Sequence, residues 1–312
     1  MEESLIDKIY NEVKDKDIEI VLGGIGEPTY YPFISKAIDR FKNHQLTLTT
    51  NGTLLEEEFR KKIIGKVNNL VVSVDGIGQK FEEIRGFNFK KIYENLHAIN
   101  ELKIKTANEI PRINIQFVAS KDNIDSIFEV MNLASELRAA SLIVSNLIPQ
   151  DLESSSKILY TRYENAEIKK LFDKIRIHSF RKGINVILPN IELKTERSCG
   201  FIDSASVVIS STGNVTPCYR FLHDSVEYVF ERKTEVEKFS FGNIKDSSIA
   251  DLYHSEQYTN FRKTILNNLQ PSCMDCDYIN GCNIVEKSDT DCYLNTPSCA
   301  DCVWDRRFTI CP

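Results

Sequence analysis

The chain has 312 residues, of which 42% are hydrophobic and 27% are charged, with a formal net charge of −6. This length and apolar content suffice for one large or two medium domains, and the mild acidity gives no basis for broad nucleic-acid binding. The first residues are acidic and amphipathic, unlike a secretion signal, and no apolar run approaches the ~20 residues of a membrane span. We therefore expect a cytoplasmic protein with neither nucleic acid nor a membrane as its partner.

The first half of the chain alternates strand-like and helix-like segments after an opening helix over residues 1–16. The strand candidates are short, β-branched and mostly apolar, as expected for strands covered on both faces. This alternation predicts a parallel sheet with right-handed crossovers, as an open sheet or a barrel. The strand candidates span residues 18–24, 45–52, 69–76, 112–120 and 141–149, with a sixth within 184–193.

Polar residues stand at or just past the carboxyl ends of these strands, where parallel α/β folds bind ligands. One such end would be an ordinary polar turn, but five in succession favour a shared site. Ser73 and Asp75 are two apart and are therefore expected on one face of their strand, as are Asn114 and Gln116. The candidates are Glu27, Asn51, Ser73, Asp75, Asn114, Gln116 and Asn146.

The first strand runs into the glycine-rich turn "GGIGEP" at residues 23–28. A dinucleotide fingerprint would need a third glycine at position 29, where Thr29 stands, and no Gly-Lys-Ser/Thr follows for a P-loop. What remains is a flexible turn followed by a carboxylate. It could bring its backbone close to a ligand, or it could be a tight turn without one.

The second half carries all nine cysteines, none of which precedes Cys199. In a reducing compartment, clustered cysteines indicate metal more often than disulfides. The spacings are C-x13-G-x4-C, then C-x2-C-x5-C, then a C-x2-C pair within the tail. From the cysteines alone, iron–sulfur clusters and zinc are equally supported. The metal-ligand candidates are Cys199, Cys218, Cys273, Cys276, Cys282, Cys292, Cys299, Cys302 and Cys311.

The segments "GIGEPTYYP", "TTNGTLL" and "VVSVDG" resemble the second to fourth strand ends of radical S-adenosylmethionine (SAM) enzymes over residues 18–149. The resemblance implies an α/β fold, a partial (β/α)6 barrel that lacks its first strand unit. It also implies that the turn residues contact the methionine moiety of SAM, and that the later strand ends contact its ribose, carboxylate or adenine. The SAM-binding residues so implied are Gly24, Gly26, Glu27, Pro28, Asn51, Ser73, Asp75, Asn114, Gln116 and Asn146.

The segment "STGNVTPCYRF", with "FSFGNIKDSSIADLYHSEQYTNFR" after it, resembles the SPASM domain, which holds auxiliary iron–sulfur clusters in radical SAM maturases. We therefore expect a radical SAM domain over residues 1–190 and a SPASM domain over residues 191–312. The resemblance implies two auxiliary [4Fe–4S] clusters. It assigns Cys273, Cys276 and Cys282 to one cluster with a tail cysteine. The other cluster takes Cys199 and Cys218 together with Cys292, and the division of Cys299, Cys302 and Cys311 stays open.

This chain departs from the SPASM pattern because nine residues, not three, separate Cys282 from Cys292. The tail "PSCADCVWDRRFTICP" further resembles the maturases of tungsten-cofactor oxidoreductases. The implied function is a maturase that generates a 5′-deoxyadenosyl radical to modify a peptide, a protein or a metal cofactor, with ferredoxin or flavodoxin as the electron donor. The alternative is a non-catalytic scaffold or binding protein held together by iron–sulfur clusters or zinc.

The family's C-x3-C-x2-C loop, which binds the [4Fe–4S] cluster that cleaves SAM, has no counterpart in these residues. A start assigned too far downstream is favoured over a genuine truncated form, because a complete strand unit is missing. Such a chain would be inactive without the upstream loop, and the radical SAM cluster is expected only if upstream residues exist. It would also expose the edge of the 18–24 strand, so we expect poor solubility or a partner that covers this edge.

Overall fold

A computed structural model describes residues 1–311, which divide into two compact units. The sheet unit contains residues 13–145 and 166–188, together with Cys311. The cysteine unit contains residues 1–12, 146–165 and 189–310. The domain boundary expected at residue 190 lies beside the start of the last of these segments. The structure also groups the opening helix and residues 146–165 with the cysteine unit.

The sheet unit is built on six strands in the order β1-β2-β3-β4-β5-β6, so that chain neighbours are also sheet neighbours. The fold-class prediction, including the sixth strand, is confirmed: the strand pairs are parallel, as βαβ connections require. β1 is an end strand, and Val21 within it is 39% exposed. The strands are β1 (Glu19–Leu22), β2 (Gln45–Thr50), β3 (Asn69–Ser73), β4 (Arg112–Ala119), β5 (Ser141–Asn146) and β6 (Val186–Ile187).

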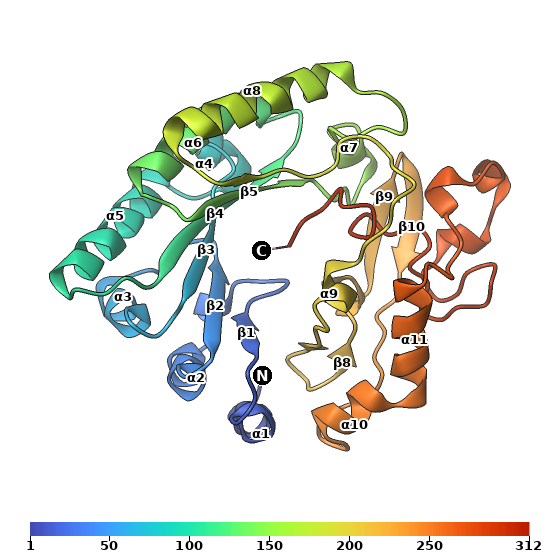
Figure 1. The fold of residues 1–312 in the computed structure, drawn as a ribbon, viewed down its shortest axis with the longest axis horizontal. Helices are drawn as coiled ribbons and strands as arrows, with labels where there is room; N and C mark the ends of the chain where they lie inside the picture. Colours follow the sequence, from blue (N-terminus) through green and yellow to red (C-terminus); the bar gives the residue numbers. More distant parts are fainter. Residues whose placement is uncertain (312) are drawn as a thin grey trace. The chain divides into compact units, whose positions relative to one another are not determined.

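Helices cover one face of this sheet (Figure 1). Burial alternates along β4, which shows which face of the sheet the helices cover. Ile113, Ile115 and Phe117 are at most 2% exposed, whereas the residues between them are half-buried. Successive strand residues point to opposite faces, so the polar members of β4 lie on the face without helices. The helices of the sheet unit are α2 (Ile34–Phe41), α3 (Glu57–Ile63), α4 (Gln79–Arg85), α5 (Phe89–Lys105), α6 (Ile127–Glu136) and α8 (Ala166–Lys182), with short 3-10 turns η1 (Pro28–Tyr30) and η2 (Ile124–Ser126).

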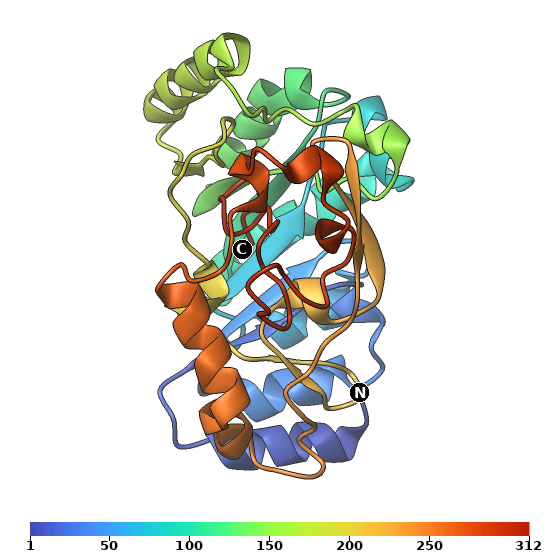
Figure 2. The same cartoon turned by 90° about the vertical axis from the view of Figure 1, so that its right-hand side faces the viewer.

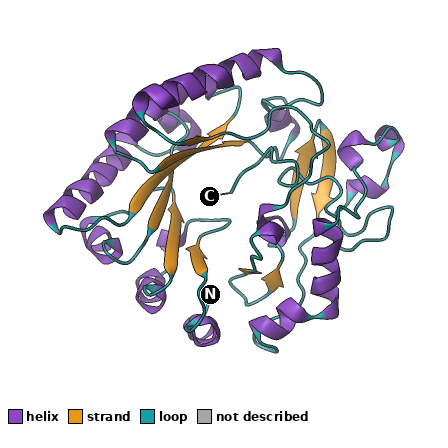
Figure 3. Ribbon diagram, viewed as in Figure 1, coloured by secondary structure: helices purple, strands orange, loops and turns teal. Residues whose placement is uncertain are grey.

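The cysteine unit consists largely of loops and turns (Figure 3). Its strands form two antiparallel pairs, β7 (Val208–Ile209) with β8 (Val215–Thr216) and β9 (Ser225–Val229) with β10 (Arg232–Val236). The tail segment runs beside the second pair (Figure 2), where the Ser288 N–H donates to the Glu235 carbonyl at 3.0 Å. The remaining elements are α1 (Glu3–Val13), α7 (Leu152–Ser155), α9 (Gly200–Asp203), α10 (Ile249–His254), α11 (Glu256–Leu266), η3 (Tyr219–Phe221), η4 (Cys273–Asp275), η5 (Ile279–Gly281) and η6 (Ile284–Glu286).

Two apolar cores hold the cysteine unit together. In the first, the rings of Phe241 and Tyr258 stack with centroids 4.0 Å apart, and Leu5 of α1 packs into the same cluster. In the second, Tyr160 stacks on Phe308 of the tail with centroids 4.4 Å apart. Aromatic side chains bury a large area each, so these stacks fix segments that have little secondary structure of their own. Across residues 1–311, none of the helices has the length and apolar character to span a bilayer.

Candidate ligand-binding edge and metal centres

The glycine turn after β1 requires its glycines for two different reasons. Gly24 and Gly26 have φ angles of +113° and +107°, in the region that side chains disfavour. At Gly23 the neighbouring strand leaves no room for a side chain, because an added Cβ would lie 2.1 Å from Thr49 Oγ1. An added Cβ at Gly26 would meet no atom within 4 Å, so this part of the turn faces open space.

Glu27 closes this turn onto the carboxyl end of β2. Its Oε1 accepts hydrogen bonds from Thr29 N at 3.0 Å, Thr29 Oγ1 at 2.5 Å and Thr50 Oγ1 at 2.7 Å. Its Oε2 accepts from Asn51 N at 2.6 Å, and Pro28 begins the 3-10 turn that Glu27 caps. Both carboxylate oxygens of Glu27 are thus bonded within the chain. Glu27, which was predicted to contact a ligand, holds the turn in place in this structure.

Asn51 continues this local network. Its Oδ1 accepts from Thr53 N at 2.9 Å and from Thr53 Oγ1 at 2.7 Å, which forms a compact polar turn after β2. The backbone of the predicted site residue is therefore held by Glu27, and its side-chain oxygen is held by Thr53. Sequence reasoning missed Thr50 and Thr53 as partners.

Ser73 and Gln116 stand opposite each other on neighbouring strands β3 and β4. Both are half-buried, and neither side chain forms a hydrogen bond to the rest of residues 1–311. Asn114 shares their face, but its Oδ1 accepts from Ser141 Oγ at 2.8 Å. Asn114 and Gln116 both lie in β4, so the expectation that they share one face agrees with the structure, whereas Asp75 lies past the end of β3. Ser73 and Gln116 are the predicted polar residues whose side chains have no hydrogen-bond partner among residues 1–311.

Asp75 lies just past β3 and is only 4% exposed. Its Oδ1 accepts from Val118 N at 2.7 Å, and its Oδ2 pairs with Arg85 Nη2 of α4 at 2.5 Å. Burial raises the pKa of Asp75, and the Arg85 charge and the Val118 amide partly offset this increase. The carboxylate of Asp75 thus joins α4 to the end of β4. Its oxygens bond to Arg85 and Val118, which belong to the chain itself.

Asn146, the last residue of β5, is 1% exposed and belongs to the cysteine unit. Its side-chain amide donates to the carbonyls of Asn190 and Phe308, each at 2.9 Å. Its backbone N–H donates to the same Phe308 carbonyl at 3.2 Å. Asn146, which was predicted to lie beside the adenine, therefore anchors the chain near Phe308. The two residues are 162 positions apart, and the sequence gives no sign of this contact.

None of the nine cysteines forms a disulfide. The thiols whose charges act on one another divide eight of them into two sets. Set A comprises Cys199, Cys218, Cys299 and Cys302. Cys199 and Cys299 pack against the same apolar core, and the Cys302 N–H donates to the Cys299 carbonyl at 3.3 Å. Burial raises the pKa of Cys299 well above its usual range, and its three set members raise it further because their charges lie nearby.

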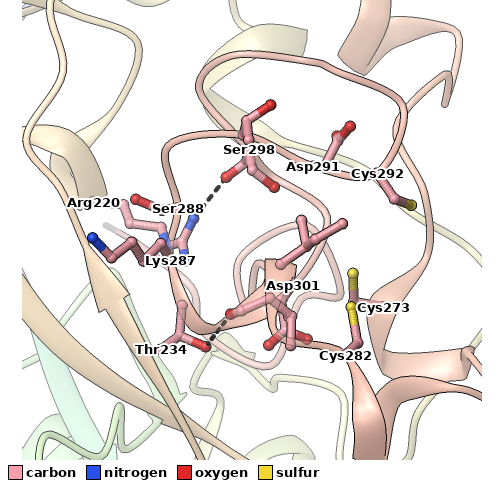
Figure 4. Close-up of a pocket in the computed structure, with 13 residues that line it drawn as sticks. Arg220, Thr234, Cys273, Cys282, Lys287, Ser288, Asp291, Cys292, Ser298 and Asp301 are labelled. Carbon is pink, nitrogen blue, oxygen red and sulfur yellow. Dashed lines mark hydrogen bonds between the residues drawn. The ribbon is translucent and has the colours of Figure 1, made fainter.

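Set B comprises Cys273, Cys276, Cys282 and Cys292. Three of these, Cys273, Cys282 and Cys292, line one pocket (Figure 4). Burial raises the pKa of Cys273 to about 12, with Asp301, Cys292 and Cys282 adding to the increase. The resemblance implied that Cys292 groups with Cys199 and Cys218, whereas the structure places Cys292 in one pocket with Cys273 and Cys282. The nine residues between Cys282 and Cys292 fold so that Cys292 lies close to the C-x2-C-x5-C segment. Cys311 is grouped with the sheet unit.

The donor chemistry of both sets fits a metal cluster. Burial makes a bare thiolate costly, so thiols at these positions ionise only where positive charge compensates them, as ligated iron does. Among residues 1–311, no three histidine, cysteine or carboxylate groups converge tightly enough to hold one metal ion. The sets are thus neighbouring thiols rather than closed single-ion sites.

Two ion pairs, one buried and one partly buried, lie among these cysteines. Arg220 Nε donates to Glu227 Oε2 at 2.9 Å, and Arg232 Nη2 pairs with Asp301 Oδ2 at 2.5 Å. Burial lowers the pKa of Arg220, but the charges of Glu227 and nearby thiols outweigh it and raise that pKa overall. Burial raises the pKa of Asp301, and the nearby charge of Arg232 partly offsets this increase. Sequence reasoning missed all four residues; the only available signal was the closeness of Arg220 and Asp301 to cysteines in the chain.

Comparison with known proteins places this architecture in a family. Residues 1–142 match the model of the radical SAM superfamily, and residues 199–277 match that of the SPASM iron–sulfur cluster-binding domain. The chain belongs to the radical SAM superfamily and carries a SPASM domain, as the sequence motifs predicted. It is 35% identical over 306 residues to the tungsten-containing aldehyde ferredoxin oxidoreductase cofactor-modifying protein of Pyrococcus furiosus, covering 94% of this chain and 83% of that relative.

Solved structures agree on the fold. SuiB of Streptococcus suis bound to S-adenosylmethionine matches with a TM-score of 0.59 at 16% identity, over 89% of this chain; the chain spans 65% of that protein's length. The protein anSMEcpe with bound AdoMet matches with a TM-score of 0.58 at 18% identity. The match covers 99% of this chain and 83% of the anSMEcpe chain. The likeness at this identity is one of fold.

Proposed function

We propose that this protein is a radical SAM/SPASM maturase that modifies a peptide, a protein or a metal cofactor. The observation that carries the proposal is the match of this chain to both the radical SAM and the SPASM family models, with eight cysteines gathered in one unit. A non-catalytic scaffold would need neither the glycine turn nor the free polar pair at the sheet edge, and the relative that shares most of the chain is a cofactor-modifying protein.

Set A and set B would each hold one auxiliary [4Fe–4S] cluster through four thiolates. Such clusters supply one-electron transfer, or a binding iron where a ligand position is open. The chain's own contribution is to bury the thiolates and to place charged groups beside them. The 4% exposure of Arg220 and of Asp301 supports this, because buried charges act through a lower dielectric than exposed ones.

SAM would bind at the carboxyl edge of the sheet. Ser73 and Gln116 would donate or accept hydrogen bonds there, and the Gly24–Gly26 backbone would approach the ligand closely. Glu27 and Asp75 would act one step removed, by fixing the turn and the end of β4. Asn51, Asn114 and Asn146 would contribute mainly to the shape of the edge, since each is held within the chain.

The substrate class is proposed by analogy. The 35%-identical relative is named for modifying the cofactor of a tungsten-containing oxidoreductase, and SuiB has been solved with its precursor peptide. Tungsten-cofactor maturation is therefore the favoured role, with a peptide or protein substrate as the other member of the class. A small redox protein such as ferredoxin or flavodoxin would supply electrons.

Anaerobic purification followed by iron, sulfide and zinc analysis tests the metal, and detection of 5′-deoxyadenosine after adding SAM and dithionite tests the activity. Residues 1–312 contain no cysteine before Cys199, so they offer no C-x3-C-x2-C loop. We expect about eight irons per chain, no 5′-deoxyadenosine from residues 1–312 alone, and product when a form carrying that loop is assayed. Zinc in place of iron, or a loop-bearing form that yields no product, would contradict the proposal.

A further inference from the structure

Arg220 is a buried cation that joins the two cysteine sets. It lies two residues after Cys218 in η3 and is 4% exposed. Its Nη1 donates to the carbonyl of Ser298 at 3.0 Å, immediately before Cys299 of set A. The same side chain lines the pocket that contains Cys273, Cys282 and Cys292 of set B (Figure 4). One guanidinium therefore faces the backbone of one set and the thiol pocket of the other.

The counterion of Arg220 is equally enclosed. Glu227, in β9, is 5% exposed, and the side chains of the two partners are 2% and 7% exposed. A buried ion pair gains little stability over an apolar pair of the same volume, because desolvation offsets the attraction. Stability alone is thus a weak reason to keep a charged pair at this position, whereas a fixed charge beside a redox site acts on the electron directly.

We propose that Arg220 is a positioning residue that raises the reduction potential of the cluster held by set A, with Glu227 limiting its effect. The inference rests on the proposed ligation of that cluster. One-electron reduction adds a negative charge to the cluster, and dithionite supplies that electron in the test below. A guanidinium stays protonated throughout, so it favours the reduced form in proportion to its proximity and to the low dielectric around it.

A purely structural role for Arg220 makes a different prediction. If the pair acted only by packing and by holding the Ser298 carbonyl, Arg220→Gln and Glu227→Gln would shift the potential in the same direction or not at all. If the charge of Arg220 matters, Arg220→Gln and Glu227→Gln shift the potential in opposite directions, because the first removes a positive charge and the second a negative one. Opposite signs cannot arise from a shared loss of packing.

The experiment is an anaerobic redox titration with dithionite, followed by electron paramagnetic resonance, on the full chain with its clusters. Iron and sulfide are measured first for every variant. Arg220→Gln is expected to shift the reduction equilibrium of one cluster at least tenfold toward the oxidised form, which is about 59 mV for one electron. Glu227→Gln is expected to shift it at least tenfold toward the reduced form.

The control is Lys245→Gln, which removes a charge from the same unit at a side chain that is 48% exposed. Solvent screening should hold its effect below twofold. If Arg220→Gln loses iron, Glu227→Gln decides alone. Variants with full iron and equilibria within twofold of the wild type would overturn the inference. A wild type without iron would overturn the cluster assignment itself, and the inference with it.

Discussion

Glu27→Gln tests whether the carboxylate after the glycine turn organises the sheet edge. The amide keeps the size of the side chain but replaces one carboxylate oxygen with an NH2 group, which cannot accept from both Thr29 and Asn51 as the carboxylate does. A hydrogen bond to a charged group contributes about 1.5–3 kcal/mol. Because tenfold corresponds to 1.4 kcal/mol, we expect the Thr29 or Asn51 amide hydrogen to exchange roughly 10- to 100-fold faster.

Residue-resolved hydrogen exchange by nuclear magnetic resonance is the assay, because the local opening of this turn need not change global unfolding. The matched control is Glu56→Gln, an exposed residue that precedes α3 without a side-chain capping bond. It should leave the exchange rates of both amides within twofold of the wild type. Equal rates in Glu27→Gln and in the control would show that Glu27 does not hold the turn.

Three further outcomes are expected. Hydrogen bonds from Lys62 and then Lys66 lower the pKa of Asp39, so its contribution is present above the ordinary carboxyl pKa and is lost as the pH falls through the lowered value. Asp39→Asn should therefore cost up to about 1 kcal/mol of unfolding free energy in urea at pH 7, and this cost should disappear as the pH falls through the lowered pKa of Asp39. A cost that does not change with pH would contradict this prediction. Gly23→Ala should destabilise the sheet unit by about 1–3 kcal/mol through overpacking at the neighbouring strand, measured as a lower urea midpoint, and an unchanged midpoint would count against the tight packing of Gly23 on Thr49. Eight other thiols already suffice for two [4Fe–4S] clusters, so Cys311→Ser should retain full iron, and a loss of iron would show that this cysteine is a ligand.

The strands of the sheet unit could be predicted because each is a short apolar run bounded by polar turns. The roles of Glu27 and Asp75 could not. The partners of Glu27 at the end of β2 and just past it lie 23 and 24 residues away, and the Val118 amide lies 43 residues from Asp75. A polar strand end looks the same in sequence whether it faces a ligand or a distant backbone amide.

The cysteine unit shows the same limit for a different reason. The spacing motifs identified every cysteine of the two sets, but the resemblance grouped Cys292 with Cys199 and Cys218, whereas the structure places it beside Cys273 and Cys282. Its place depends on how the tail folds over β10, where Ser288 pairs with Glu235, and loop segments carry no periodic signal for such contacts. Likewise, the apolar face of α1 was visible in the sequence, but its packing against the cysteine unit through Leu5 was not.

The iron content of two nested cysteine variants tests the central claim most directly. Replacing Cys273 and Cys276 by serine in the anaerobically reconstituted chain should reduce iron from about eight to about four atoms per chain. Adding Cys292→Ser to that variant should leave iron at about four, because Cys292 belongs to the set already lost. A further fall toward zero would place Cys292 with Cys199 and Cys218, and would contradict the two sets.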